Sequence, residues 1–536
     1  MEEKKKFFLI ALFDQLHGMP SNFWFACVME IFERLAFFGS RAVAPLYLVK
    51  QANENGLGLG FDEKGHIFAI WALIQCLVPM VSGGYTDRYG FRKSLAIAFV
   101  LNVIGYSGMA LSLPITLWLV GHGYESPGYW VFLTFACFVG FGTAIFKPAA
   151  HGTIAKSTNE ENSSVGWGMF YWVVNFGGAL APMIAAEIRG EINWDYVFWF
   201  AAAVTAINFL PAFLLFKEPE RVPPKEGEEE KGVVGVFVSS ISTAVRDVRL
   251  LVFLGIFSCF WLMFMQLWDL TPNFIDEWVD TSNIAPAFTF FRDKWVSATG
   301  QVKPEMMINI NPWSIILLVL IVSALIRKIN KIAAMVIGMV IAMVGFVGAG
   351  LTTLGWFCAL MILIFSIGEM TCSPTFQAYI GLIAPKDKKA LYMGYSNIPF
   401  AIGWAVGNLV GGTLYESMSS KINLARRYMV DHLSMSESSV EAIKDEHLLA
   451  SLAKTLQPEQ AAVFTKLDAE GKYLPETISA IRDATTQVLW DAYHPERVWY
   501  YLGAIGLLGT LGMLCFFFLT RKTAGEEPES SEASGS

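Results

Sequence analysis

Four charged residues stand inside an apolar stretch near the start of the chain. The stretch runs from Phe23 to Val49 and is long enough to cross a bilayer as a helix. At about 100° per residue, its charges fall within roughly 100° of one another around the helix, and they are Glu30, Glu33, Arg34 and Arg41. Ionised groups at membrane depth are costly, so this stripe must face a water-filled cavity or charges on other helices. Two acids and two bases exceed what one structural ion pair needs, which favours a functional site.

Other apolar segments also carry isolated polar side chains. Lys147 precedes Pro148 and is most simply a charge in a cavity, although a lysine reaching to the membrane surface is the alternative. The further candidates, which include two acids, are Tyr171, Asn175, Asp269, Asn311 and Glu369. For an amide in a membrane helix, the alternative to a functional role is a hydrogen bond to a neighbouring helix. For an amide that precedes a proline, the alternative is a helix cap.

The composition predicts the elements that position these residues. Of 536 residues, 54% are hydrophobic and 16% are charged, which is typical of a polytopic membrane protein. We expect six helices in 23–216, a cytoplasmic linker in 217–249, five helices in 250–416 and a twelfth in 497–520. Six helices, a hydrophilic linker and six more indicate an all-α fold of two six-helix bundles.

Three segments fall outside the predicted bundles. Residues 1–22 are expected to form a cytoplasmic lead-in, and the acidic, serine-rich 521–536 a disordered tail. Residues 417–496 are rich in Ala, Leu, Glu and Lys with amphipathic periodicity, so we expect a helical insert, extracytoplasmic by topology. It is either a passive cap or a surface for a partner.

Lysine and arginine in the connections set the orientation. The predicted inner loops are basic, whereas the outer connections 121–129 and 188–194 hold only Arg189. This pattern predicts a multi-pass protein of the cell (inner) membrane with both termini in the cytoplasm. The inner loop between the second and third helices holds Asp87 and Arg88, between Gly83 and Gly90. These charges can bridge adjacent helix ends, which assigns them to gating, and the loop resembles the signature of the major facilitator superfamily.

Several motifs resemble one family within that superfamily, the proton-dependent oligopeptide transporters. The first helix is similar to the family pattern E-x-x-E-R-F-x-Y-Y-G followed by an arginine, but has Leu35, Phe37 and Phe38 at the aromatic positions. Segments 140–148, 170–177 and 368–374 resemble the family's G-x-G-x-x-K-P, F-Y-x-x-I-N-x-G and G-E-L-x-x-S-P motifs. The resemblance covers nearly all twelve helices and identifies the chain as a divergent member.

The resemblance implies a proton-coupled symporter that imports di- or tripeptides, or similar small zwitterions, by alternating access. It assigns proton coupling to Glu30, Glu33 and Glu369, and substrate binding to Arg34, Arg41, Lys147, Tyr171, Asn175, Asn311 and Glu369. We add Asp269 to the residues for proton coupling, because it is the acid nearest to the position of a family acid that this chain lacks. The alternatives are a carrier of another organic anion or a drug–proton exporter, which the aromatic substitutions favour, and, more remotely, a sensor that does not transport.

The expected partners are protons, a small peptide and the lipid bilayer. The sequence shows no basic patch typical of nucleic-acid binding, no metal-spaced His/Cys cluster and no nucleophile or phosphate-loop motif. We therefore expect a transporter without cofactor or metal, and not an enzyme. A monomer is expected, although the sequence leaves the oligomeric state open.

Position 265 departs from the family in a way that yields a structural prediction. Met265 stands where the family has an acid that is thought to pair with the arginine matching Arg41. Asp269 lies four residues further along, on nearly the same helix face and about 6 Å along the axis. We predict that Asp269 replaces the missing acid as the partner of Arg41 in the outer gate. The alternative is that Asp269 lies at the membrane interface beside Trp268.

Overall fold

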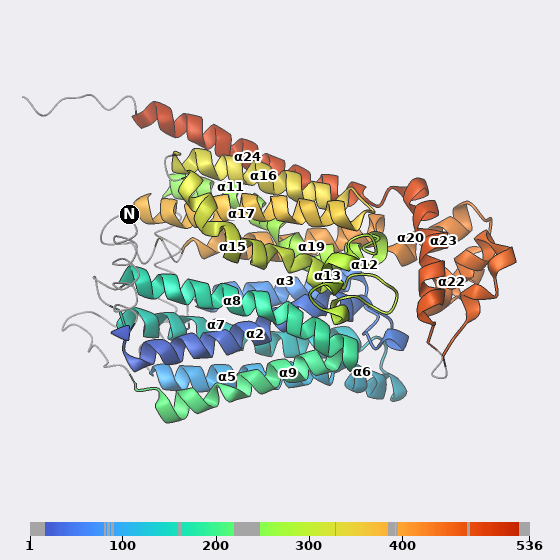
Figure 1. The fold of residues 1–536 in the computed structure, drawn as a ribbon, viewed down its shortest axis with the longest axis horizontal. Helices are drawn as coiled ribbons and strands as arrows, with labels where there is room; N and C mark the ends of the chain where they lie inside the picture. The colour runs from blue at the N-terminus through green and yellow to red at the C-terminus, as the bar shows by residue number, and fades with distance from the viewer. Residues whose placement is uncertain are drawn as a thin grey trace, which may run out of the picture.

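The computed structural model describes residues 17–79, 82, 86, 90–158, 163–218, 247–326, 329–383, 392, 395–468 and 472–524. These residues are mostly helical, and within them the only β-structure is three isolated bridges. The long helices run nearly parallel to one axis and divide into a lower and an upper group (Figure 1). The predicted all-α class is therefore confirmed. Most of the lead-in, the linker and the tail lie outside the described residues.

The first bundle is the lower group of helices in Figure 1. Its long helices are α2 (Ser21–Val49), α3 (Phe61–Leu77), α5 (Phe91–Ala110), α7 (Gly128–Lys156), α8 (Ser163–Glu191) and α9 (Trp194–Ile207), and α9 is followed by a π-helical turn, η2 (Pro211–Leu215). The apolar residues 94–120 do not form one helix, because α5 ends at Ala110 and a separate α6 (Ser112–Gly121) follows. Pro114 explains this break: it lacks the N–H that would bond the Ala110 carbonyl, and its ring would clash there.

The second bundle is the upper group. Its long helices are α11 (Val248–Asp269), α15 (Ile310–Ile326), α16 (Lys331–Gly350), α17 (Gly355–Ile383), α19 (Asn397–Met418) and α24 (Arg497–Ala524). The seventh apolar segment is also divided, since α11 ends at Asp269 and α12 (Thr271–Trp278) continues beyond Leu270. Three short helical elements then lead to α15, namely α13 (Ala285–Thr289), η3 (Asp293–Trp295) and α14 (Pro304–Ile308).

Nine helices of the described residues are long and apolar enough to cross a membrane. Three helices of the bundles fall outside that group: α2 carries four charges, and α3 and α15 have 17 residues each. All three run alongside the other long helices (Figure 1). Within the second bundle, small residues allow α16 and α17 to cross closely, because a Cβ on Gly368 would meet the backbone N of Ala342 at 2.2 Å.

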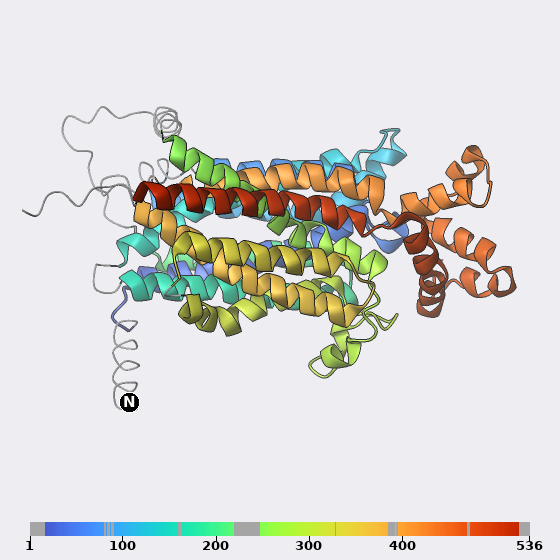
Figure 2. The ribbon, with the colours of Figure 1, turned by 90° about the horizontal axis from the view of Figure 1, so that it is seen from above.

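The insert forms a small helical unit beyond one end of the bundles. It comprises α20 (Lys421–Asp431), α21 (Glu437–Glu441), α22 (Asp445–Leu456), the 3₁₀ turns η4 (Pro458–Gln460) and η5 (Val463–Thr465), and α23 (Pro475–Tyr493). Figures 1 and 2 both place its helices beyond the same end, which we call the insert end. Phe464, Ala450 and Ala484 are buried in a small apolar core of its own.

Candidate functional site

A cavity of about 250 Å³ lies between the two bundles. Both bundles contribute polar side chains to its wall, and these are Arg34, Arg41, Gln75, Lys147, Asn175, Asn311 and Glu369. The remaining wall is largely aromatic or apolar and includes Phe37, Phe38, Trp261, Phe264, Met265, Trp268, Phe400 and Trp404. The cavity therefore offers charges of both signs within an apolar frame, which suits a small amphipathic or zwitterionic solute.

The acids of α2 lie behind the cavity wall and hold Arg34. Glu30, Glu33 and Arg34 are all buried. The Arg34 Nε lies 3.1 Å from Oε1 of Glu30, and its Nη2 contacts a carboxylate oxygen of Glu33. Two carboxylates thus share one guanidinium. Arg34 lines the cavity, and neither acid is in the wall.

Lys147 and Asn175 approach this cluster from α7 and α8. Lys147 is half-buried in the cavity wall and close enough to Arg34 and Glu33 for their charges to interact. The Asn175 Nδ2 donates to the Tyr171 carbonyl oxygen at 2.9 Å, within the same helix. Tyr171 itself is 52% exposed and is not among the residues of the cavity wall.

The second bundle places one carboxylate in the wall. The Asn311 Nδ2 donates to Glu369 Oε2 at 2.7 Å and lies 3.1 Å from Ser366 Oγ. This fixes the Glu369 carboxylate from α17 against the start of α15. Glu369 faces the cationic side chains of the first bundle across the cavity, and no cation contacts it in an ion pair within the described residues.

The expected contact between Arg41 and Asp269 is present. The Arg41 Nη2 contacts Asp269 Oδ1, and Trp404 Nε1 donates to the second oxygen, Oδ2, at 2.9 Å. Asp269 is fully buried. The Arg41 guanidinium also lies over aromatic rings, 4.0 Å from the centroid of Phe68 and 5.2 Å from that of Trp71. Such stacking suits an arginine in an apolar environment.

A second buried cation, Lys64 of α3, also crosses to the end of α11. Its Nζ donates to the Asp269 carbonyl oxygen at 2.9 Å and to Asn273 Oδ1 at 2.8 Å. The Asn273 Nδ2 in turn donates to the Pro45 carbonyl oxygen of α2 at 2.9 Å. A cation suits this position because the last carbonyls of a helix carry partial negative charge. Sequence reasoning missed Lys64, although it is a lone lysine only two residues before a long apolar run.

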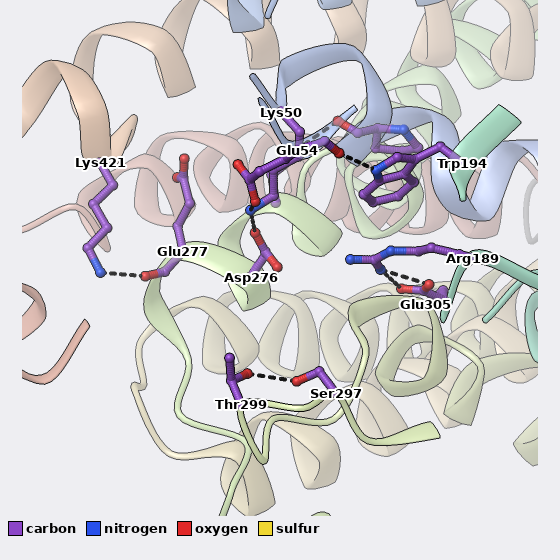
Figure 3. Close-up of polar contacts among 12 residues, drawn as sticks. Lys50, Glu54, Arg189, Trp194, Asp276, Glu277, Ser297, Thr299, Glu305 and Lys421 are labelled. Atoms are coloured by element: carbon purple, nitrogen blue, oxygen red, sulfur yellow. Dashed lines mark hydrogen bonds and ion pairs between the residues drawn. The ribbon is translucent and has the colours of Figure 1, made fainter. Parts of the chain in front are cut away.

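Further ion pairs join the bundles at the insert end. The Lys50 Nζ lies 2.6 Å from Asp276 Oδ2, and the Arg189 Nη1 lies 2.8 Å from both Glu305 oxygens (Figure 3). Arg292 likewise binds both oxygens of Glu187 at 2.6 and 2.8 Å. These pairs join α2 and α8 to the segment between α11 and α15.

Helices α3 and α19 touch at the same end without side chains between them. A Cβ on Gly65 would lie 2.4 Å from the Asn408 carbonyl oxygen, and one on Gly412 would lie 2.6 Å from that of Phe61. Glycine permits this approach because it lacks a Cβ. Together with the ion pairs, the close crossing shows that the bundles are joined at the insert end.

Two predicted gating residues and one unpredicted residue complete the inventory. Asp87 and Arg88 lie outside the described residues. Gln75 of α3 lines the cavity and was not predicted from the sequence. The only signal for it is a lone amide in the apolar run that follows His66.

Comparisons with known proteins agree with this architecture. The profile of the Major Facilitator Superfamily matches residues 26–408. The multidrug resistance protein MdtH of Photorhabdus laumondii is 21% identical over 394 residues, which cover 72% of this chain and 84% of MdtH. The peptide transporter YePEPT of Yersinia enterocolitica is 23% identical over 456 residues, covering 72% of this chain and 86% of that protein.

A solved structure shows the same fold. The crystal structure of the peptide transporter POT in complex with sulfate superposes with a TM-score of 0.60 at 15% identity, over 94% of this chain and 95% of that chain. The match to the superfamily profile runs from α2 into α19. The chain therefore belongs to the Major Facilitator Superfamily, and it is a multi-pass membrane transporter and not an enzyme.

Proposed function

We propose that the protein is a divergent proton-coupled symporter that imports di- or tripeptides, or similar small zwitterions. The carrying observation is the separation of charge across the cavity. Arg34 and Lys147 stand on the first bundle, and Glu369 stands opposite them on the second. A solute with a carboxylate at one end and an ammonium at the other would satisfy both walls and hold the two bundles together.

The volume and lining favour a short substrate. Ligand pockets usually measure about 300–1,000 Å³, so a cavity of about 250 Å³ is slightly smaller than this range. The aromatic side chains can receive varied substituents without requiring hydrogen bonds from them. Asn175 and Asn311 supply amides at opposite walls, although both already donate to protein oxygens.

Proton coupling is assigned to the acids that share Arg34. When the Arg34 guanidinium turns to a substrate carboxylate, Glu30 and Glu33 lose part of their compensation. Two unpaired carboxylates at this depth are costly, so one of them binds a proton. Release of substrate returns Arg34 to the acids and expels the proton, which links one proton to each turnover. Glu369 and Asp269 are further candidates for proton binding.

The contacts that join the two bundles at the insert end support an assignment of this conformation within the transport cycle. We assign the insert end to the outside of the cell (inner) membrane, with both termini in the cytoplasm, so this conformation is closed outward. Opening requires separation of Arg41 from Asp269 and of Lys50 from Asp276. The resulting cycle is alternating access by rocking of the two bundles around the central cavity.

A drug–proton exporter is the second candidate, because of the aromatic wall. Phe37 and Phe38 replace hydroxyl-bearing residues of the peptide transporter motif, and Met265 replaces an acid. These changes make the cavity more apolar, and the relative MdtH is named for multidrug resistance. An apolar cation would use Glu369 without needing Lys147.

Uptake into proteoliposomes separates the two candidates. With an inward proton gradient, we expect uptake of radiolabelled Ala-Ala, and unlabelled peptide should inhibit it by competition. N-acetylation or C-terminal amidation of the unlabelled peptide should weaken that inhibition. Glu369→Gln should lose the dependence on the free amine. Absence of peptide uptake together with proton-driven movement of ethidium would replace the symporter with the exporter.

A further inference from the structure

Gln75 is a buried polar side chain in the cavity wall that the proposed cycle does not use. It is 2% exposed and belongs to α3. Neither its Nε2 nor its Oε1 has a hydrogen-bond partner within the described part of the chain. A buried amide without hydrogen-bond partners destabilises a protein. Its presence at the surface of a cavity therefore indicates that a bound ligand supplies the missing partners.

The position of Gln75 distinguishes it from the other amides of the site. It follows Phe68 and Trp71 at helical spacing, so the three share the face of α3 that holds Arg41. Asn175 and Asn311 both donate to protein oxygens. Gln75 therefore offers a donor and an acceptor side by side, both uncommitted.

A carboxamide of this kind matches one amino-acid residue in an extended conformation. The N–H and C=O of such a residue point to the same side, as they do in a pair of antiparallel strands. In a dipeptide, the second residue carries the linkage N–H, and its C=O is an oxygen of the terminal carboxylate. Oε1 of Gln75 can accept from that N–H while Nε2 donates to the carboxylate, beside the cations of the first bundle.

We propose that Gln75 is a substrate-binding residue that recognises the linkage N–H and the carboxylate of the C-terminal residue of a peptide. The inference rests on the proposed function and narrows its substrate class to N-acylated α-amino acids, of which dipeptides are the simplest zwitterionic members. An ester in place of the peptide linkage removes the N–H and leaves Oε1 without a donor.

The test removes either the linkage N–H of the substrate or the carboxamide of Gln75. Inhibition of labelled Ala-Ala uptake is measured with unlabelled L-alanyl-L-alanine and with its ester analogue, L-alanyl-L-lactate. The wild type should prefer the peptide about tenfold, as expected for one desolvated hydrogen bond. Gln75→Met keeps the side-chain length and should abolish that preference. The ratio of two inhibition constants does not depend on the amount of folded protein.

Two further variants complete the experiment. Gln266→Met is the matched control, because Gln266 is a buried glutamine of α11 whose Nε2 donates to the Leu262 carbonyl oxygen and which does not line the cavity. It should retain the tenfold ratio. Gln75→Glu keeps an acceptor for the N–H but repels the carboxylate, so affinity for both compounds should fall while the preference remains.

The outcomes are separable. An unchanged ratio in Gln75→Met, or a wild type that does not discriminate between peptide and ester, would overturn the assignment of Gln75 while leaving peptide transport intact. A wild type that takes up no peptide at all would instead refute the proposed function.

Discussion

Replacing Asp269 by asparagine should open the insert end. In the closed state, Asp269 is fully buried and compensates Arg41, which is itself 4% exposed and surrounded by aromatic rings. Removal of one partner of a buried ion pair costs about 3–5 kcal/mol, because the other charge is left unpaired. The cost applies only to the closed state, since opening hydrates Arg41. It corresponds to a shift of about 10²-fold to several thousandfold toward the open form.

Distances between spin labels report this shift. Suitable positions are Val120 of α6 and Ile478 of α23 in the insert, which are 52% and 45% exposed. In a background without the native cysteines, Asp269→Asn should move the distance distribution to longer values. The double variant Arg41→Gln/Asp269→Asn removes both charges and should return part of the short-distance population.

Transport gives the matching functional result. Proton-driven uptake should fall in either single variant, and the double variant should be no worse than either one. Losses that add in the double variant, or an Asp269→Asn protein with the wild-type distance distribution, would refute the pairing as the outer gate.

Three further variants address other parts of the cycle. Glu33→Gln should abolish uphill uptake but leave peptide counterflow measurable, because exchange needs no net proton movement; concentrative uptake in this variant would remove Glu33 from coupling. Lys147→Ala should weaken the binding of peptides with a free carboxylate about tenfold or more, which is the loss expected for a hydrogen bond to a charged group. The binding of C-terminally amidated peptides should weaken much less. Equal losses for both kinds of peptide in competition assays would assign Lys147 to gating. Gly65→Val should hinder closure, because a Cβ there would lie 2.4 Å from the Asn408 carbonyl oxygen. The same spin-label distance should therefore become longer. An unchanged distance would contradict a tight crossing of α3 and α19.

Sequence patterns predicted the features that depend on local spacing. The charged stripe of α2 follows from helical periodicity. The Arg41–Asp269 contact was predicted from the same periodicity together with the resemblance to a family that has an acid at position 265, and both the helix and the contact are present. The all-α class followed from the long apolar segments. The rule that intramembrane charges require partners supports the predictions about the charged residues.

Features that depend on tertiary contact were missed. Lys64 was missed because the apolar run begins after it, but α3 begins at Phe61 and places the lysine against the end of α11. Gln75 could not be told from an amide that bonds a neighbouring helix, because only its surroundings reveal that it lacks a partner. The division at Ala110 could have been predicted from Pro114, whose effect on the preceding turn is local.

The insert makes more and shorter contacts with the second bundle than with the first. Lys421 donates to the Glu277 carbonyl oxygen at 2.9 Å, Arg482 donates to that of Val279, and Trp490 packs against Trp278 with ring centroids 5.8 Å apart. Toward the first bundle, the Gln51 Nε2 reaches Asp445 Oδ2 at 3.5 Å. The insert should therefore travel with the second bundle as a rigid body. An antibody fragment raised against it would provide a fiducial for single-particle imaging, and the tilt of that fiducial relative to the first bundle would sort individual particles by their stage in the cycle.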